Sequence, residues 1–417
     1  MTATSIRILS CRDGFSIKDP RGFNVAGGAI GRGVGFPLPP TTAGASRTAI
    51  GDSSGWIGAP QIANWEALPK DVAVEGPLAV ARNRSSGSNS WEPLFPAPRD
   101  LLVLPPSDDD IALDTLRLLW LEPRPPSSAV RSTWSGSRDD AATEALDWPR
   151  VAEKVKPLTP PAWWGRDAAL EWLLTPTEFV KKTKMPKAGW VAEGRFDMRL
   201  AIDRVTRTAR TGYLYGLETE ETLRQDGAGF RELGIWLRVA RGPHPEPAAH
   251  WRFGGEARWA SALVLESDPF VFPRDAFAKV LDRQVTRRCR LLLMTPGVFR
   301  ARGEDRDKHR PGWLPDLFEV AKDELVFRGQ LAGIDLTLRA ALVGRAGALS
   351  GWDFKLGGPK ASRLYVPPGA IFYVEAGRDL TVDDFAALWL ATLQVPRSQE
   401  ARDGFGLVVP GLWPINP

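Results

Sequence analysis

Apolar and polar residues alternate in several short stretches of this chain, and the alternation predicts β-strands separated by turns. Residues 5–11 alternate apolar residues, Ile6 and Ile8, with polar ones, which predicts a first strand. Residues 74–80 and 95–104 are short apolar runs punctuated by proline, and they predict two strands that pair with each other. The front of the chain is therefore expected to form an antiparallel sheet.

The last third of the chain repeats this pattern more regularly. Strands are expected at 290–294, 334–343, 364–375 and 404–414, and a helix is expected at 381–395, where TVDD resembles a capping box. The resulting order is the β-α-β-β-α-β order of a ferredoxin-like fold, and the first elements of the chain fit a second copy less regularly. The pattern predicts an α+β protein with two ferredoxin-like, RRM-like domains. These are residues 1–270, with long loop insertions at about 105–165 and 180–190, and residues 280–417.

Two segments of the first half predict helices. Pro37, Pro39 and Pro40 fix φ and lack amide donors, so a helix is expected to begin at Thr41, capped by the Thr41 or Thr42 hydroxyl, with Arg47 projecting outward. A second, tryptophan-rich helical pattern covers residues 163–179. Its tryptophans are expected to pack in a core and not to stack on bases.

Composition narrows the class of protein. The chain has 417 residues, of which 43% are hydrophobic, so it can bury more than one core. Its net charge of +4 permits a nucleic-acid partner without requiring one. Cys11 and Cys289 are too far apart in sequence for a CxxC metal site or a disulfide framework, so no zinc and no cofactor are expected. The sequence shows neither signal-peptide anatomy nor a membrane-spanning apolar run, and we expect a cytoplasmic protein.

Positive charge is concentrated between residues 181 and 210. This stretch holds nine basic and three acidic residues, a local balance of +6. Alternation in FDMRLAID places the apolar residues of 196–202 on one strand face, and Arg204, Arg207 and Arg210 cluster where the strand turns. Two interpretations remain open for this stretch: a solvated face, or a contact with an RNA backbone next to a lysine loop.

Other candidate sites are weaker. GGAIGRGVG at 27–35 lacks the Lys-Ser/Thr of a Walker-type loop, although Arg21 and Arg32 can contact phosphate. Gly404, Gly406 and Gly411 would allow a nucleic-acid backbone to approach the main chain. The histidines that a ribonuclease could use as acid or base are His244, His250 and His309, which lie in proline-rich or charged stretches. Trp251, Trp259 and Trp352 are expected to be exposed, which favours missing protein partners.

A series of motifs spanning residues 11–411 resembles one known family. In order, they are CRDG, FPLPPTTAGASRTAIG, GPLAV, FPAPRDLL, AIDRVTRTARTGYLY, FGGEAR, TPGVF, PGWLP, SGWDFKLGGPKASRLYVPPGAIFYVEA and GFGLVVPG. The series resembles the RAMP subunit that is third in the Cmr complex of type III-B CRISPR systems. The sequence departs from the family pattern in the long insertion at 105–140 and in FDMRLAID, which stands in place of the usual opening of its strand.

The resemblance implies a role in CRISPR antiviral defense. It implies two ferredoxin-like halves that bind the repeat-derived 5′ tag of a crRNA in a ribonucleoprotein, beside the large polymerase-like subunit and the first backbone subunit, with target RNA nearby. It implies no catalysis and no membrane. One alternative is a metal-independent crRNA-processing endoribonuclease of the RAMP superfamily, and another is a free-standing RNA-binding protein that acts outside any complex. The residues expected to bind RNA are Arg12, Arg21, Arg32, Arg47, Lys181, Lys182, Lys184, Arg204, Arg207, Lys355, Lys360, Arg363, Gly404 and Gly406.

Overall fold

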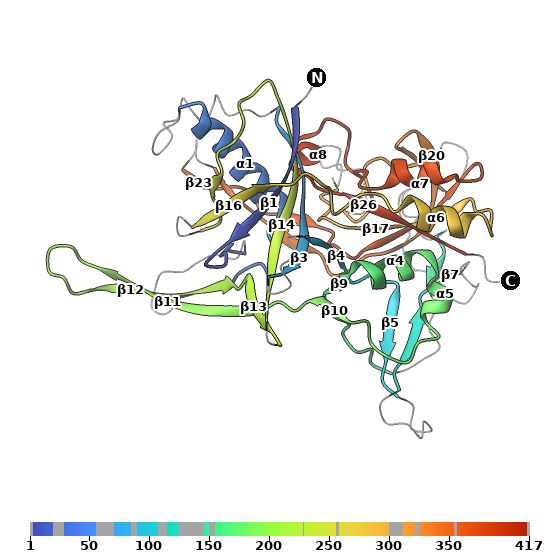
Figure 1. The fold of residues 1–417 in the computed structure, drawn as a ribbon, viewed down its shortest axis with the longest axis horizontal. Helices are drawn as coiled ribbons and strands as arrows, with labels where there is room; N and C mark the ends of the chain where they lie inside the picture. The colour runs from blue at the N-terminus through green and yellow to red at the C-terminus, as the bar shows by residue number, and fades with distance from the viewer. Residues whose placement is uncertain are drawn as a thin grey trace, which may run out of the picture.

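The computed structural model confirms the α+β class, because two large antiparallel sheets carry short helices (Figure 1). It describes residues 3–19, 29–55, 71–84, 90–106, 115–124, 146–149, 155–227, 229–255, 258–299, 312–321, 326–353 and 357–414. The candidate residues Arg21, His309 and Lys355 lie outside these ranges. No helix in the described part of the chain is long and apolar enough to cross a membrane.

The first large sheet is built from the front half of the chain. Its strand order is β10-β9-β4-β3-β14-β1-β16-β15, and β13 pairs with β14 beside this path. The expected first strand is confirmed, with Ile8 lying opposite Trp236 on one side and Leu263 on the other. The strands are β1 (Ala3–Cys11), β3 (Ala73–Asn83), β4 (Glu92–Pro96), β9 (Trp163–Gly165), β10 (Ala188–Trp190), β13 (Leu223–Asp226), β14 (Gly229–Gly242), β15 (His250–Arg252) and β16 (Trp259–Val264).

The second large sheet uses the last third of the chain. Its order is β18 (Glu319–Val320), β19 (Phe327–Leu331), β20 (Ile334–Leu342), β25 (Ile371–Ala376), β17 (Arg288–Leu293) and β26 (Val408–Leu412). The strands expected at 290–294 and 334–343 are confirmed. The strand expected at 364–375 is wrong as one unit, because it divides into β24 (Arg363–Tyr365) and β25. Pro367 and Pro368 lie between them and cannot donate to a sheet.

The two sheets share one hydrophobic core. Ile8 and Trp236 of the first sheet belong to the same buried cluster as Tyr373 and Val409 of the second. A buried ion pair crosses this core, where Arg290 Nη1 lies 2.6 Å from an Asp100 carboxylate oxygen and both residues are 0% exposed. The Tyr373 hydroxyl donates to the same carboxylate at 3.0 Å, so the buried charges are fully paired.

The helices begin and end differently from the sequence prediction. Helix α1 (Pro39–Ser53) starts at Pro39 and not at Thr41, because prolines fit the first turn, where amides have no intrahelical acceptor. Leu38 caps it without a side-chain hydrogen bond. The 163–179 pattern divides into β9, α4 (Arg166–Leu174) and α5 (Pro176–Phe179), but Trp164 and Trp172 are buried as expected. Helix α7 (Val382–Leu388) is shorter than predicted, and its capping box at Thr381 is confirmed.

Smaller sheets and two further helices complete the described structure. The run expected as one strand at 95–104 is two strands: β4 pairs with β3, and β5 (Leu101–Leu104) pairs with β6 (Arg117–Trp120). The other pairs are β7 (Pro123–Arg124) with β8 (Trp148–Pro149), β21 (Gly347–Leu349) with β24, and β22 (Trp352–Asp353) with β23 (Gly358–Pro359). The two helices are α6 (Arg274–Leu281) and α8 (Gln399–Asp403).

Candidate nucleic-acid interface

A long β-hairpin extends from the body of the molecule and carries part of the predicted basic stretch (Figure 1). It consists of β11 (Gly194–Ile202) and β12 (Ala209–Glu220), which pair antiparallel over most of their length. A short strand, β2 (Ala29–Gly31), adds to β12 in parallel near the body. The hairpin therefore belongs to a separate three-stranded sheet.

Among the described residues, no core covers the apolar face of β11. Phe196, Met198, Leu200 and Ile202 alternate along the strand as the sequence predicts, and their exposed fractions lie between 47% and 62%. Val205 at the tip is 92% exposed. A periodic apolar strand face normally packs on a core of its own chain, so this arrangement is typical of a surface that meets a partner.

The tip of the hairpin presents two arginines to solvent. Arg204 and Arg207 are both exposed in the turn between the strands, which confirms that these cations gather where the strand reverses. Asp203 orders the turn, because its carboxylate accepts the amides of Val205 and Thr206 at 2.9 Å each. The turn holds Arg207 in the left-handed backbone conformation, with a φ of 56°.

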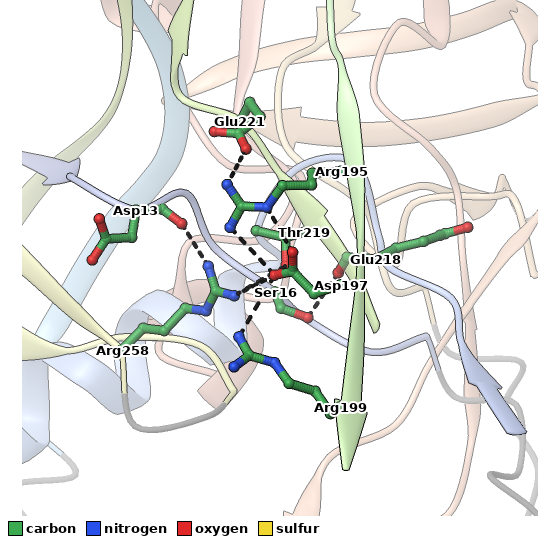
Figure 2. Close-up of polar contacts among 9 residues, drawn as sticks. All are labelled: Asp13, Ser16, Arg195, Asp197, Arg199, Glu218, Thr219, Glu221 and Arg258. Atoms are coloured by element: carbon green, nitrogen blue, oxygen red, sulfur yellow. Dashed lines mark hydrogen bonds and ion pairs between the residues drawn. The ribbon is translucent and has the colours of Figure 1, made fainter. Parts of the chain in front are cut away.

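The base of the hairpin is held to the body around Asp197 (Figure 2). Its carboxylate lies 2.7 Å from Arg195 Nε, 3.1 Å from Arg258 Nη2 and 3.6 Å from Arg199 Nη2. Thr219 on β12 donates its hydroxyl to the same carboxylate at 3.1 Å. These hydrogen bonds, with that of Arg195 the largest effect, lower the pKa of Asp197 to about 2, so it stays ionised.

Arg258 connects this cluster to the first sheet. Its guanidinium donates to Asp197 and also to the backbone carbonyl of Asp13, in the turn that follows β1 (Figure 2). Ser16 strengthens the junction by donating its hydroxyl to the Glu218 carbonyl at 2.8 Å. The hairpin is therefore bonded to the body through side chains from two separate parts of the sequence, Ser16 and Arg258, and its direction is defined by the body.

A shallow cavity of about 290 Å³ lies at the same junction. The residues that line it include Phe15, Phe196, Gly33–Gly35, Glu218 and Glu220. Burial raises the pKa of Glu220. Glu218 accepts the amide of Gly33 at 2.8 Å, which ties the glycine-rich segment before α1 to the hairpin.

The lysine loop does not form one surface with the hairpin arginines. Lys181, Lys182 and Lys184 are exposed as expected, but they follow α5, which lies at the opposite side of the molecule from the hairpin tip (Figure 1). Lys181 pairs with Glu178 at 2.7 Å and Lys182 pairs with Glu171 at 2.5 Å. The expectation that the arginine turn lies next to the lysine loop is wrong, because β10 and β11 carry the chain away between the two groups.

Two other predicted cations meet at helix α8. Arg47 does not project outward: it is 8% exposed, pairs with Asp403 at 2.7 Å and donates to the Val72 carbonyl at 2.9 Å. Arg363 pairs with Glu400 on the same helix at 2.8 Å. Both guanidinium groups therefore neutralise carboxylates of α8 and join this helix to α1 and β24.

The predicted glycines approach the protein's own backbone and not an exposed surface. Gly404, Gly406 and Gly411 are buried. A Cβ at Gly404, which has a φ of 93°, would lie 2.1 Å from the carbonyl oxygen of Gly76. A Cβ at Gly411 would lie 2.8 Å from the Leu173 side chain. The expectation that these glycines admit a nucleic-acid backbone is wrong, because β3 occupies the space at Gly404, the Gln394 side chain that at Gly406 and α4 that at Gly411.

The remaining predicted residues are scattered over the surface. Arg12, Arg32 and Lys360 are exposed. Of the histidines, His244 bonds to Asp71 at 2.9 Å and His250 is exposed on β15. The described residues contain no group of three or more His, Cys, Asp or Glu side chains arranged to hold a metal ion.

The tryptophan prediction is partly wrong. Trp259 is 56% exposed as expected, whereas Trp251 is 1% exposed and packs between the sheet and α1. The Asp197–Arg258 contact was not predicted at all. It joins residues that are far apart in the sequence, and neither has a local motif that would identify its partner.

Comparison with known proteins identifies a family. The family model described as CRISPR-associated protein (Cas_Cmr3) matches residues 7–413, nearly the whole chain. Two solved structures align at a TM-score of 0.40 with 13% and 14% sequence identity, each covering 88% of this chain and 86% of the other. Their titles are "Cryo-EM structure of the Type III-B Cmr-beta bound to cognate target RNA and AMPPnP, state 1" and "Cryo-EM structure of the Type III-B Cmr-beta bound to cognate target RNA". Among curated proteins, none matches the chain.

Proposed function

The chain belongs to the CRISPR-associated Cas_Cmr3 family, and from this membership we propose that it is a non-catalytic RNA-binding subunit of a type III-B effector complex. It holds the repeat-derived 5′ tag of a crRNA and bridges the large polymerase-like subunit to the backbone of the complex. Such a subunit acts in the cytoplasm, where crRNA and its targets are found.

The strand order of both large sheets supports two ferredoxin-like halves. In the first sheet the consecutive path is β3-β14-β1-β16, and in the second it is β20-β25-β17-β26. In the first sheet, the earliest strand along the chain, β1, lies between its antiparallel neighbours β14 and β16, and the next strand, β3, lies at the edge of the four. In the second sheet, β17 lies between β25 and β26 in the same way, and β20 lies at the edge. This is the spatial order that a β-α-β-β-α-β unit produces.

The observation that carries the RNA-binding proposal is the hairpin. It projects from the body, carries Arg204 and Arg207 at its tip, and is bonded at its base by Asp197 and Arg258. Two exposed cations on a fixed projection can contact phosphates at low entropic cost, because the base of the hairpin is already ordered. The apolar face of β11 offers area for a neighbouring subunit.

A catalytic role has less support. Among the described residues, the His244 ring pairs with Asp71 near the surface, and neither His244 nor His250 lines the cavity beside the hairpin. General acid–base cleavage of RNA needs a titratable group within hydrogen-bond reach of the reacting hydroxyl or leaving oxygen. No contact of the described histidines favours such a role over binding.

The test is a binding titration with RNA carrying the 5′ tag. The full chain and its Arg204→Ala/Arg207→Ala variant are titrated at several salt concentrations, with the same RNA carrying a scrambled tag as competitor. Removing two phosphate contacts should weaken binding to both RNAs by similar factors and reduce the slope of log K against log salt by about 2. The matched control is Arg274→Ala/Arg287→Ala, which removes two exposed arginines from the second half.

Three outcomes would contradict the proposal. If the double tip variant binds as tightly as the wild type at every salt concentration, the tip is only a solvated turn. If the wild type does not prefer tagged RNA, even when co-expressed with the other subunits of its complex, tag recognition belongs elsewhere. Cleavage of repeat RNA by the isolated chain would favour the processing nuclease.

A further inference from the structure

A second surface with the chemistry of a stacking platform lies on the first sheet, away from the hairpin tip. It is formed by Ser10 of β1, Trp259 and Ser261 of β16, and His250 and Arg252 of β15, and we call these five residues the β15–β16 shelf. Ser261 lies directly opposite Ser10 on one side and His250 on the other, and Trp259 lies opposite Arg252. Residues that are opposite in antiparallel strands project from the same face, so all five side chains share one surface.

The shelf leaves the ring of Trp259 open to solvent. The indole is 56% exposed, and the guanidinium of Arg252 lies 5.9 Å from its ring centroid. Leu263, two positions further along the same face, already packs on the core shared by the two sheets. Ser10 and Ser261, the described neighbours of Trp259 and Arg252 on this face, have small side chains and leave room beside the indole.

The charges around the shelf are positive. Among the described residues, Arg252 has no carboxylate within ion-pair distance. Glu232, which accepts the Ser10 hydroxyl, is paired with both Arg82 at 2.8 Å and Arg84 at 3.0 Å. One carboxylate is thus matched by two guanidinium groups, and Arg84 is itself exposed. An exposed indole, an adjacent guanidinium and surplus positive charge complement a stacked base and its phosphate.

We propose that the β15–β16 shelf binds single-stranded RNA, with one base stacked on Trp259, its phosphate contacted by Arg252 and the Ser261 hydroxyl available to the sugar. The inference rests on the proposed RNA-binding function but concerns a contact separate from the hairpin tip. A platform of this kind is tolerant of sequence, because every base has a π-face. The shelf therefore adds affinity for an unpaired stretch of RNA without reading its sequence.

The test uses the full chain and single-stranded RNA in which 2-aminopurine replaces one base at a time. Stacking on the indole should quench the fluorescence of the probe at one position in the wild type. Trp259→Ala should abolish that quenching and weaken binding about tenfold, the loss expected for one stacked base. Trp259→Phe keeps a ring and should retain both signals within about threefold, whereas Trp259→Leu, which keeps apolar area without a π-face, should behave like alanine.

A control variant and three outcomes separate the possibilities. Val264→Ala, at an exposed position on the same strand, should bind RNA as the wild type does. If Trp259→Ala binds normally while the hairpin-tip variant does not, the shelf inference is wrong and the proposed function stands. If Trp259→Ala loses a co-expressed subunit but keeps RNA, the shelf is a protein interface. If the wild type binds no RNA at all, both the proposed function and the inference fail.

Discussion

The buried pair of Arg290 and Asp100 makes a sharp prediction about stability. Asp100→Asn keeps the shape of the side chain but removes the charge that Arg290 faces at 2.6 Å, in a site where both residues are 0% exposed. Removing one partner of a buried pair leaves the other charge uncompensated, which costs about 3–5 kcal/mol. The Asn side chain also disturbs the hydrogen bonds that Trp172 and Tyr373 donate to this carboxylate at 2.9 and 3.0 Å.

Urea denaturation followed by tryptophan fluorescence measures the effect. For a slope near 3 kcal/mol per M, a loss of 3–5 kcal/mol lowers the midpoint by about 1–1.7 M. Adding Arg290→Met to Asp100→Asn should recover part of this loss, because the lone charge is gone, and the double-mutant cycle should show a coupling above about 1 kcal/mol. The control is Arg287→Ala, whose pair with Asp379 is more than half exposed on both sides and contributes at most about 1 kcal/mol. An Asp100→Asn midpoint indistinguishable from that control would refute the reasoning.

Two other predictions follow from single positions. Gly404→Ala should destabilise the protein by more than about 1 kcal/mol in the same denaturation assay, because φ is 93° and the new methyl would collide with the Gly76 carbonyl. Gly44→Ala in α1 should instead stabilise the protein by about 0.5–1 kcal/mol, because nothing lies within 4 Å of the added Cβ. Asp197 has a pKa lowered to about 2, so its contribution to holding the hairpin is present above the ordinary value of 3.8 and is lost as the pH falls toward 2. Limited proteolysis with pepsin between pH 2 and pH 4 should cleave the hairpin base faster as the pH falls. Asp197→Asn should remove this pH dependence of cleavage. An equal pH dependence in both proteins would contradict the role of ionised Asp197 in holding the hairpin.

Local pattern was enough to predict much of the fold. Alternation at Ile6 and Ile8 identified β1, the apolar run at 334–343 identified β20, and the TVDD sequence identified the start of α7. The burial of Trp164 and Trp172 followed from their size and apolar character, although Trp164 lies in β9 and not in the expected helix. These predictions succeeded because strand and helix periodicity, capping and burial each depend on residues close in sequence.

The sites were harder to predict than the strands. The sequence around an arginine is similar whether it is exposed or buried in an ion pair, and the sequence around a glycine is similar whether a ligand or the chain's own backbone approaches it. Arg204 and Arg207 were correctly expected to cluster at a turn, since the turn is local. Arg47 was expected outside and is buried against Asp403, a partner more than 350 residues away in the chain. Gly404 permits close approach as expected, but the approaching backbone is that of β3.

The sequence by itself determined the class of fold, the positions of its main strands and, through ordered motifs, the family. The tertiary structure alone decided which charges are available to a partner. Arg258 reaches Asp197 across 61 positions of sequence, and the apolar face of β11 stays exposed because the hairpin leaves the body. Whether a charge or a strand face stays exposed depends on which distant residues the fold brings next to it. The local spacing of residues does not contain that information.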